Sequence, residues 1–235
     1  MICFEDIHLQ LGGQPVLRGF DWQPPVGELN LLVGANGAGK STALKVGAGL
    51  WQADSGRIRM VDTGAGAAAA SSQSSAVAYL PQAPAFHPRL RVLDILRFYA
   101  RIEGCGKAAV AQAVEQFGLD AHVRHRSAAL SGGLRQRLGL AVLSLSPAAV
   151  WMLDEPGLSL DPFWRRRLQG WLREACAEGR TILVATHLLA EWAGRADHCY
   201  LCERGRIADS LDVAHMQDEL SEMESVPQQK QEALG

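Results

Sequence analysis

The chain has 235 residues, 48% of them hydrophobic, and 23 basic against 25 acidic side chains give a formal net charge of −2. This length and apolar content are enough for one substantial α/β domain with a subdomain, and they exclude disorder throughout. The nearly even charge balance argues against a nucleic-acid partner held by phosphate neutralisation. Five scattered cysteines favour a reducing cytosol over a disulfide framework.

No stretch approaches the ~18 uninterrupted apolar residues of a membrane-spanning helix. No basic start followed by an apolar core indicates a signal peptide either. We therefore expect a cytoplasmic protein, one that would serve a membrane process only as a bound partner.

The first third of the sequence is rich in strand patterns, runs that alternate apolar and polar residues or are wholly apolar. These strands cover residues 2–11, 16–22, 28–33, 57–61 and 77–80. A helix is predicted over residues 40–50. The low-complexity segment 64–75, rich in Gly, Ala and Ser, predicts a loop.

The middle of the chain changes to a helical period. Between residues 92 and 119 apolar residues recur every three or four positions, and Gly104 and Gly106 separate two helices. Val92, Ile95, Leu96, Tyr99 and Ile102 are expected on one face, and Val110, Val114 and Phe117 on another. This block predicts a helical subdomain, at about residues 84–145, inserted into an otherwise β/α chain.

The β/α order resumes in the last part of the chain. Helices are predicted over residues 134–145 and 161–178, buried strands over residues 148–153 and 181–185, and a closing hairpin over residues 198–202 and 206–209. The sequence thus predicts an α/β fold with a mixed, mainly parallel sheet, an N-terminal antiparallel β subdomain and a helical subdomain. Residues 1–211 would form this domain, and the polar tail 212–235 is expected to fray.

The stretch GANGAGKST, residues 34–42, stands between an apolar strand and a helix. It fills the pattern G-x-x-x-x-G-K-[ST], in which glycines let backbone N–H groups face phosphate oxygens and the helix N-terminus adds its dipole. Lys40 is expected to reach the β- and γ-phosphates, while the Ser41 hydroxyl ligates Mg²⁺. The residues predicted to hold the nucleotide are Gly34, Ala35, Asn36, Gly37, Ala38, Gly39, Lys40, Ser41 and Thr42.

A second signature supports a P-loop nucleotide site. Residues 150–153 are apolar and are followed by Asp154 and Glu155, as in a buried strand whose carboxyl end opens onto a ligand crevice. Asp154 would hold Mg²⁺, and Glu155, which faces differently, would deprotonate a water aimed at the γ-phosphorus. An acidic strand end without function would leave its pairing with the phosphate loop unexplained.

Two other motifs have competing interpretations. Cys199-x-x-Cys202 could be a metal or redox pair, but residues three apart on a strand face opposite sides and no second pair lies nearby. We favour two strand cysteines. The Trp-Arg-Arg-Arg run from Trp164 could contact nucleic acid, yet helical spacing favours a packed tryptophan beside a solvated charged face.

Taken in order, these segments resemble the ATP-binding cassette ATPases over about residues 1–210. In addition to the phosphate loop and the carboxylate strand, Gln82 matches the glutamine loop of that family and residues 130–136 match its signature loop. Asp161 matches the D-loop aspartate and His187 the switch histidine. Six matches in the family's order are far more specific than any one of them.

The resemblance implies a head-to-tail dimer, in which the ATP held by one phosphate loop is covered by the partner's signature loop. Ser131, Gly132 and Gly133 would offer hydroxyl and backbone donors to the γ-phosphate of the other subunit's ATP. Asp161 would cross the interface and couple the two sites. The second ATPase subunit is expected to be an identical chain.

The resemblance also implies which residues perform the hydrolysis of ATP to ADP and phosphate. Gln82 would sense Mg²⁺ and link the nucleotide to the helical subdomain. The metal-binding set would be Ser41, Gln82 and Asp154. The catalytic set would be Lys40, Glu155 and His187, with His187 bonded to the γ-phosphate and holding the attacking water.

Two positions depart from the family pattern. Leu11 stands where an aromatic residue usually stacks on adenine, so base stacking should be weaker or supplied elsewhere, with looser discrimination between ATP and GTP. Phe4 and Trp22 are substitutes that the sequence places poorly. Leu134 stands where a glutamine often follows the signature glycines, a position that varies.

The resemblance favours a transport motor: an ATPase on the inner face of the cell membrane that drives a separate integral membrane permease. Residues 86–104 resemble the corresponding region of bacterial export-type subunits. The alternative is a soluble ATPase of cofactor or iron–sulfur assembly, which capture of a soluble scaffold would favour. A subunit without turnover is disfavoured because Lys40, Glu155 and His187 are all present.

Overall fold

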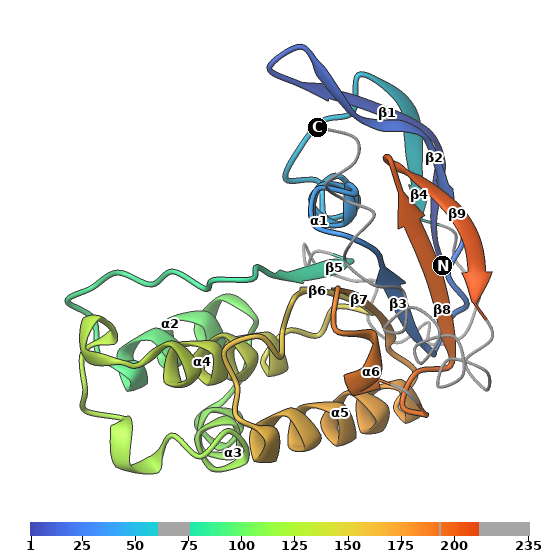
Figure 1. The fold of residues 1–235 in the computed structure, drawn as a ribbon. Coiled ribbons are helices and arrows are strands. Elements are labelled where there is room, and N and C mark those ends of the chain that lie inside the picture. The colour runs from blue at the N-terminus through green and yellow to red at the C-terminus, as the bar shows by residue number, and fades with distance from the viewer. Residues whose placement is uncertain (61–75, 193, 212–235) are drawn as a thin grey trace, which may run out of the picture.

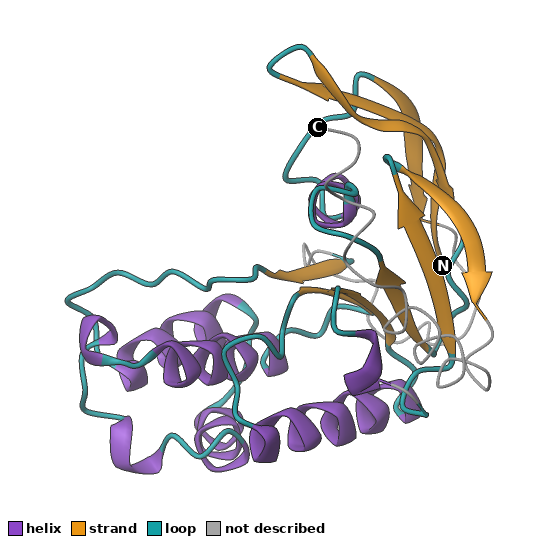
Figure 2. Cartoon of the chain, viewed as in Figure 1, coloured by secondary structure: helices purple, strands orange, loops and turns teal. Residues whose placement is uncertain are grey.

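The computed structural model describes residues 1–60, 76–192 and 194–211 (Figure 1). The predicted loop at residues 64–75 and the predicted tail at residues 212–235 lie outside these ranges. The described part contains a three-stranded sheet in the order β2-β1-β4 and a six-stranded sheet in the order β5-β6-β7-β3-β8-β9. Helices lie on both sides of the larger sheet (Figure 2).

The strands lie close to the predicted positions. They are β1 (Ile2–Leu11), β2 (Gln14–Trp22), β3 (Leu29–Val33), β4 (Ser55–Met60), β5 (Val77–Leu80), β6 (Val150–Asp154), β7 (Thr181–Thr186), β8 (His198–Glu203) and β9 (Arg206–Leu211). The helices are α1 (Lys40–Gly47), α2 (Val92–Ile102), α3 (Lys107–Gln116), α4 (Gly132–Ser144), α5 (Pro162–Ala177) and α6 (Leu189–Trp192), with short 3₁₀ turns at Asp120–His122 and Ser127–Ala129.

The strand pairings confirm the predicted fold class. In the smaller sheet β1 pairs antiparallel with both β2 and β4. In the larger sheet β5, β6, β7, β3 and β8 run parallel, and only β9 at the edge is antiparallel to its neighbour. The parallel strands place their carboxyl ends along one edge of the sheet, the edge at which α/β proteins bind ligands.

The larger sheet separates two apolar cores. On β3, Leu31 packs with the core that includes α2 to α5, whereas Leu32 packs with the core that includes α1, β1 and β2. This alternation follows from the two-residue period of a strand buried on both faces. On β8, Cys199 lies in the first core and Cys202 in the second, so the two thiols face opposite sides, as the strand interpretation predicts.

The apolar face predicted for α2 is only partly covered by other elements. Val92, Ile95 and Leu96 are buried, but Ile102, the last residue of the helix, is 61% exposed. The periodicity fixes the direction in which a side chain points, but it does not show whether another element covers that side chain. The shared face of α2 is therefore covered at its beginning and exposed at its last residue.

The arginine-rich helix α5 packs as the solvated-face interpretation expects. Leu168 and Leu172 are buried in the helix-side core. The Trp164 ring packs against the same core, and the Arg137 guanidinium lies 4.3 Å from its centroid. Arg165 forms an ion pair with Glu191.

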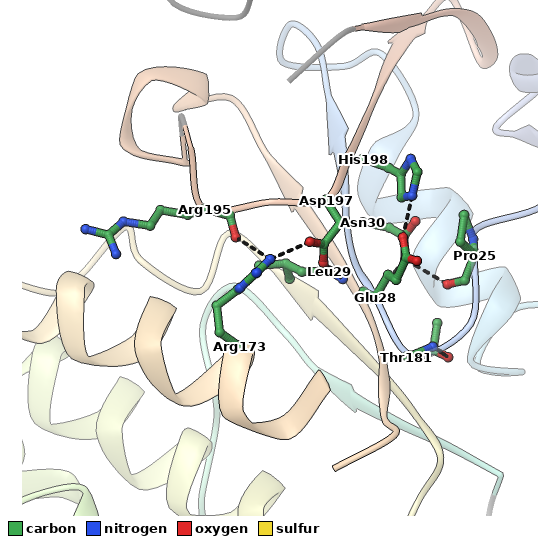
Figure 3. A network of polar contacts seen from close by, with 10 residues as sticks. Pro25, Glu28, Leu29, Asn30, Arg173, Thr181, Arg195, Asp197 and His198 are labelled. Atoms are coloured by element: carbon green, nitrogen blue, oxygen red, sulfur yellow. Dashed lines mark hydrogen bonds and ion pairs between the residues drawn. The ribbon is translucent and has the colours of Figure 1, made fainter. Parts of the chain in front are cut away.

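A polar network joins α5 to the amino ends of β3 and β8 (Figure 3). The backbone N–H of Leu29 donates to Asp197 Oδ2 at 2.9 Å, and Arg173 pairs with the same carboxylate. Glu28 pairs with His198, the first residue of β8. Because Val33 at the other end of β3 leads into the phosphate loop, this network lies at the sheet edge opposite the candidate site.

No helix within residues 1–60, 76–192 and 194–211 combines the length and apolar character that crossing a bilayer requires.

Candidate active site

The phosphate loop connects β3 to α1 at the carboxyl edge of the larger sheet. Gly34 has φ +146°, and a Cβ there would lie 2.2 Å from the Cys202 carbonyl oxygen, so only glycine fits. Lys40, which is 6% exposed, donates from Nζ to the carbonyl oxygens of Gly34 at 2.6 Å and Ala35 at 3.0 Å. The amine is thus held against the backbone of the phosphate loop.

The turn between β8 and β9 supports the phosphate loop from behind. The Gly205 N–H donates to the Ala38 carbonyl oxygen at 2.8 Å, and Cys202 Sγ donates to the same oxygen at 3.2 Å. A Cβ on Gly205 would lie 2.1 Å from the Val16 carbonyl oxygen, so this turn is pressed between two elements. Sequence reasoning predicted the hairpin but not this role, because nothing in its pattern shows which loop it contacts.

The predicted metal ligands Ser41 and Asp154 are in direct contact. Ser41 Oγ donates to Asp154 Oδ1 at 2.8 Å, and Tyr79 Oη donates to Oδ2 at 3.3 Å. Burial raises the pKa of Asp154, an effect partly opposed by these two hydrogen bonds. Burial and the Asp154 charge likewise raise the pKa of Tyr79. Tyr79, on the neighbouring strand β5, was not predicted from the sequence.

Glu155 follows Asp154 with a left-handed backbone, φ +47°. Its side chain is 8% exposed. Oε1 lies 2.7 Å from His187 Nδ1, and Oε2 accepts a hydrogen bond from Thr186 Oγ1 at 3.1 Å. The structure therefore brings the predicted base and the predicted switch histidine together, across the neighbouring carboxyl ends of β6 and β7.

The remaining predicted residues lie elsewhere on the chain. Gln82 is exposed just beyond β5, and among the described residues no hydrogen bond joins it to Ser41 or Asp154. Ser131 is the N-cap of α4, where its Oγ accepts from the Leu134 N–H at 3.3 Å. Gly132 and Gly133 lie in the first turn of α4, which begins two residues before the predicted helix start.

Asp161 and the signature loop belong to one packed region. Asp161 is the N-cap of α5, and its Oδ1 accepts from the Trp164 N–H at 2.9 Å. A Cβ on Gly133 would come within 2.9 Å of the Ser159 carbonyl oxygen, so the segment before Asp161 packs directly on the signature loop.

Neither Phe4 nor Trp22, the two proposed substitutes for an adenine-stacking residue, is accessible to a ligand. Phe4 is 0% and Trp22 3% exposed, since both pack in the core beside α1. Leu11 is 39% exposed at the end of β1. Its aliphatic side chain offers dispersion contacts to a base but no aromatic face.

The donor chemistry of the site fits a magnesium nucleotide. Ser41 and Asp154 supply the hard oxygen ligands that Mg²⁺ prefers, and a divalent cation would offset the cost of an ionised, buried Asp154. The glycine loop supplies backbone N–H groups and the N-terminus of α1 for phosphate oxygens. Fold and site together define a P-loop nucleotide-binding protein with two buried carboxylates, Asp154 and Glu155, at the strand ends.

Comparison with known proteins narrows this class. A family model described as ABC transporter matches residues 17–157, more than half of the chain, and the chain belongs to that family. A second model, described as an AAA domain, putative AbiEii toxin of a type IV toxin–antitoxin system, matches residues 125–191. The fold and family confirm the resemblance stated from the sequence, and they make the chain an ATP-binding ATPase of the transport family.

Two relatives illustrate the similarity. The Nod factor export ATP-binding protein I of Burkholderia orbicola is 32% identical over 224 residues, which cover 93% of this chain and 73% of that protein. The cytochrome c biogenesis ATP-binding export protein CcmA of Cupriavidus necator is 36% identical over 183 residues, with 75% and 78% covered.

Solved structures agree with the fold. The ATP-binding subunit of an ABC transporter superposes with a TM-score of 0.78 at 25% identity, covering 94% of this chain and 93% of that one. A bacterial ABC transporter cassette described as dimeric superposes with a TM-score of 0.77 at 18% identity, covering 91% and 99%. The latter likeness concerns the fold alone.

Proposed function

We propose that the chain is the ATP-hydrolysing subunit of an exporter, acting on the inner face of the cell membrane with a separate integral membrane permease. The observation that carries the catalytic part is the pairing of Glu155 with His187, 2.7 Å apart, beside the Ser41–Asp154 contact. The direction of transport is supported by relatives whose names describe export.

The proposed chemistry uses residues at the carboxyl edge of the sheet. Ser41 and Asp154 would hold Mg²⁺, which would supply positive charge to offset the charge of the phosphate oxygens. Lys40 adds a positive charge near the same oxygens. Glu155 accepts a proton from the attacking water. Its buried carboxylate, in contact with Thr186 and His187, is placed to orient that water.

The contact with Glu155 constrains how His187 can bind a phosphate. If Nδ1 is protonated and donates a hydrogen bond to Glu155, Nε2 of the neutral ring is an acceptor only. A hydrogen bond to a γ-phosphate oxygen therefore requires either a protonated Nε2 or a turn of the ring that breaks the contact. We propose that His187 exchanges Glu155 for the phosphate as the nucleotide is enclosed.

We propose that a second, identical copy completes the site. Ser131 and Gly132 are exposed at the N-terminus of α4, and among the described residues no hydrogen bond joins them to the phosphate loop of the same chain. Their donors are thus available to a nucleotide held by another subunit. A structural neighbour with this fold is described as a dimer. Gln82 is proposed to complete the metal sphere once the nucleotide is bound.

The proposed surface for the permease is the outer face of α2. Phe98 is 57% and Ile102 61% exposed, and the groove that they line is also lined by Arg97, Arg101 and Asp94. A second groove, of about 530 Å³, runs between α2 and α3 and shares both arginines. Exposed aromatic and aliphatic groups beside cations suit a partner segment that carries apolar and acidic side chains.

Replacing Glu155 with Gln tests the catalytic part of the proposal. Glutamine keeps the size of the side chain but cannot take a proton from water, so ATP turnover should fall at least 100-fold while ATP still binds. Size-exclusion chromatography with Mg²⁺-ATP should then show an accumulated dimer. Arg166→Gln, on the exposed face of α5, is the matched control.

Unchanged turnover in Glu155→Gln would rule out Glu155 as the base. For the transport part, membranes of the native host should yield the chain together with an integral membrane protein. Capture of a soluble scaffold complex in its place would favour the cofactor-assembly ATPase instead.

A further inference from the structure

Three successive residues at the end of β7 each contact Glu155. The Glu155 N–H donates to the Ala185 carbonyl oxygen at 2.9 Å, Thr186 Oγ1 donates to Oε2 at 3.1 Å, and His187 Nδ1 lies 2.7 Å from Oε1. Each carboxylate oxygen therefore has its own partner. Of these three residues only His187 was predicted from the sequence to act on the nucleotide.

Thr186 is built into its place. It is 2% exposed, and its Oγ1 accepts a hydrogen bond from the Leu188 N–H at 3.1 Å. The hydroxyl oxygen is the acceptor in that bond, so its own proton remains available to donate to Glu155. The β-branched side chain has few rotamers, so the donor position is stiff.

Glu155 needs such support more than an ordinary glutamate. Its left-handed backbone, φ +47°, is a conformation that L-residues other than glycine rarely adopt. The long side chain would also lose its fixed orientation if one oxygen were released, and a misplaced base loses catalytic efficiency steeply. His187 cannot supply this support alone if it turns toward a phosphate during the cycle.

We infer that Thr186 is a positioning residue, whose hydroxyl holds the Glu155 carboxylate in the orientation required for proton abstraction when His187 moves away. This inference rests on the proposed role of Glu155 as the base. Thr186 makes no contact with nucleotide in this account, so it should influence the chemical step and leave ATP affinity unchanged. The adjacency of a hydroxyl residue and the switch histidine, read together with the β6–β7 pairing, is the signal that locates it.

The decisive comparison is Thr186→Val against Thr186→Ser. Valine matches threonine in shape but lacks the hydroxyl that donates to Glu155 and accepts from the Leu188 N–H, so kcat for ATP hydrolysis by the purified chain should fall about tenfold, while KM for ATP changes less than twofold. Serine restores the hydroxyl and should recover most of the lost kcat. A loss that serine does not recover, or a parallel rise in KM, would assign Thr186 a merely structural role and overturn the inference.

A second background separates this inference from the proposed function. If Glu155→Gln lowers turnover to a small but measurable residual rate, adding Thr186→Val to that variant should leave the residual rate unchanged, because the hydroxyl acts through the carboxylate. A further tenfold loss in that background would show an effect independent of Glu155 and contradict the inference. If Glu155→Gln keeps full turnover, the base assignment fails first, and the inference fails with it.

Discussion

At the scale of single residues, Asp154 illustrates how a buried carboxylate opposes folding until a ligand arrives. Burial raises its pKa above the ordinary value of 3.8, although the bonds from Ser41 and Tyr79 lower it. A raised pKa in the folded state means that folding favours the protonated form. The associated stability is fully present below the ordinary pKa and is lost as the pH rises through the raised value.

We therefore predict that Asp154→Asn stabilises the nucleotide-free chain near neutral pH, by about 1 kcal/mol, because asparagine carries no charge to desolvate. The free energy of unfolding of the parent should fall with rising pH over the acidic range, and the variant should lack this fall. Urea titrations from pH 4 to 8, without Mg²⁺, measure both. Asp120→Asn, at an exposed aspartate, is the control, and parallel curves for parent and Asp154→Asn would contradict the prediction.

At this scale the sequence predicted residues whose chemistry is local. Ser41, Asp154 and Glu155 each follow a strand or loop pattern that places them at the carboxyl edge of the sheet, and their contacts confirm this placement. Tyr79 and Thr186 were missed because their contacts require knowing that β5 and β7 flank β6. Strand order is a property of the tertiary fold, and no single run of residues encodes it.

At the scale of elements, the N-cap residue of α5, Asp161, is also a residue expected at the dimer interface. Asp161 accepts from the Trp164 N–H, Pro162 occupies the first helical turn, and the same aspartate is the one expected at the dimer interface. We predict that Asp161→Ala lowers the free energy of unfolding by about 1 kcal/mol, whereas Asp161→Asn, an equally good cap, changes it by a few tenths at most. Urea denaturation of the two variants measures the difference.

The same pair separates the cap from the interface. If Asp161 also couples two subunits through its charge, Asp161→Asn should keep the stability but weaken the ATP-dependent dimer formed in the Glu155→Gln background. Equal stability of the alanine and asparagine variants would show that the cap contributes nothing. An unaffected dimer would remove Asp161 from the proposed interface.

Sequence periodicity predicted whether a segment is a helix or a strand. The residues at which an element ends depend on its caps and contacts. The predicted helix at residues 134–145 begins earlier, at Gly132, because the Ser131 side chain caps it. The short helix α6 was not predicted, since a four-residue helix leaves no repeat to detect. The helical subdomain at about residues 84–145 stays a prediction, with α2, α3 and α4 falling inside it.

At the scale of the whole molecule, the larger sheet contributes side chains to two cores, and the candidate site lies at its carboxyl edge. Neighbouring residues of β3 pack on opposite sides, so the strand that leads into the phosphate loop is fixed by both cores. At its other end the network of Glu28, Arg173, Asp197 and His198 ties β3 to α5 and β8 (Figure 3). The loop is therefore mounted on a rigid strand, while the helices that carry the signature loop lie on one face of the sheet (Figure 1).

The last prediction concerns the surface through which those helices would contact the permease. The outer face of α2 exposes Phe98 and Ile102, so replacing both with Ser should change the free energy of unfolding by less than about 0.5 kcal/mol. The same double variant should lose co-purification with an integral membrane partner from detergent extracts, because apolar contact at the centre of an interface supplies most of its binding energy. Leu50→Ser, at a residue 58% exposed just beyond α1, is the control and should keep the partner. If the α2 variant retains the partner as fully as Leu50→Ser does, the permease docks on another surface.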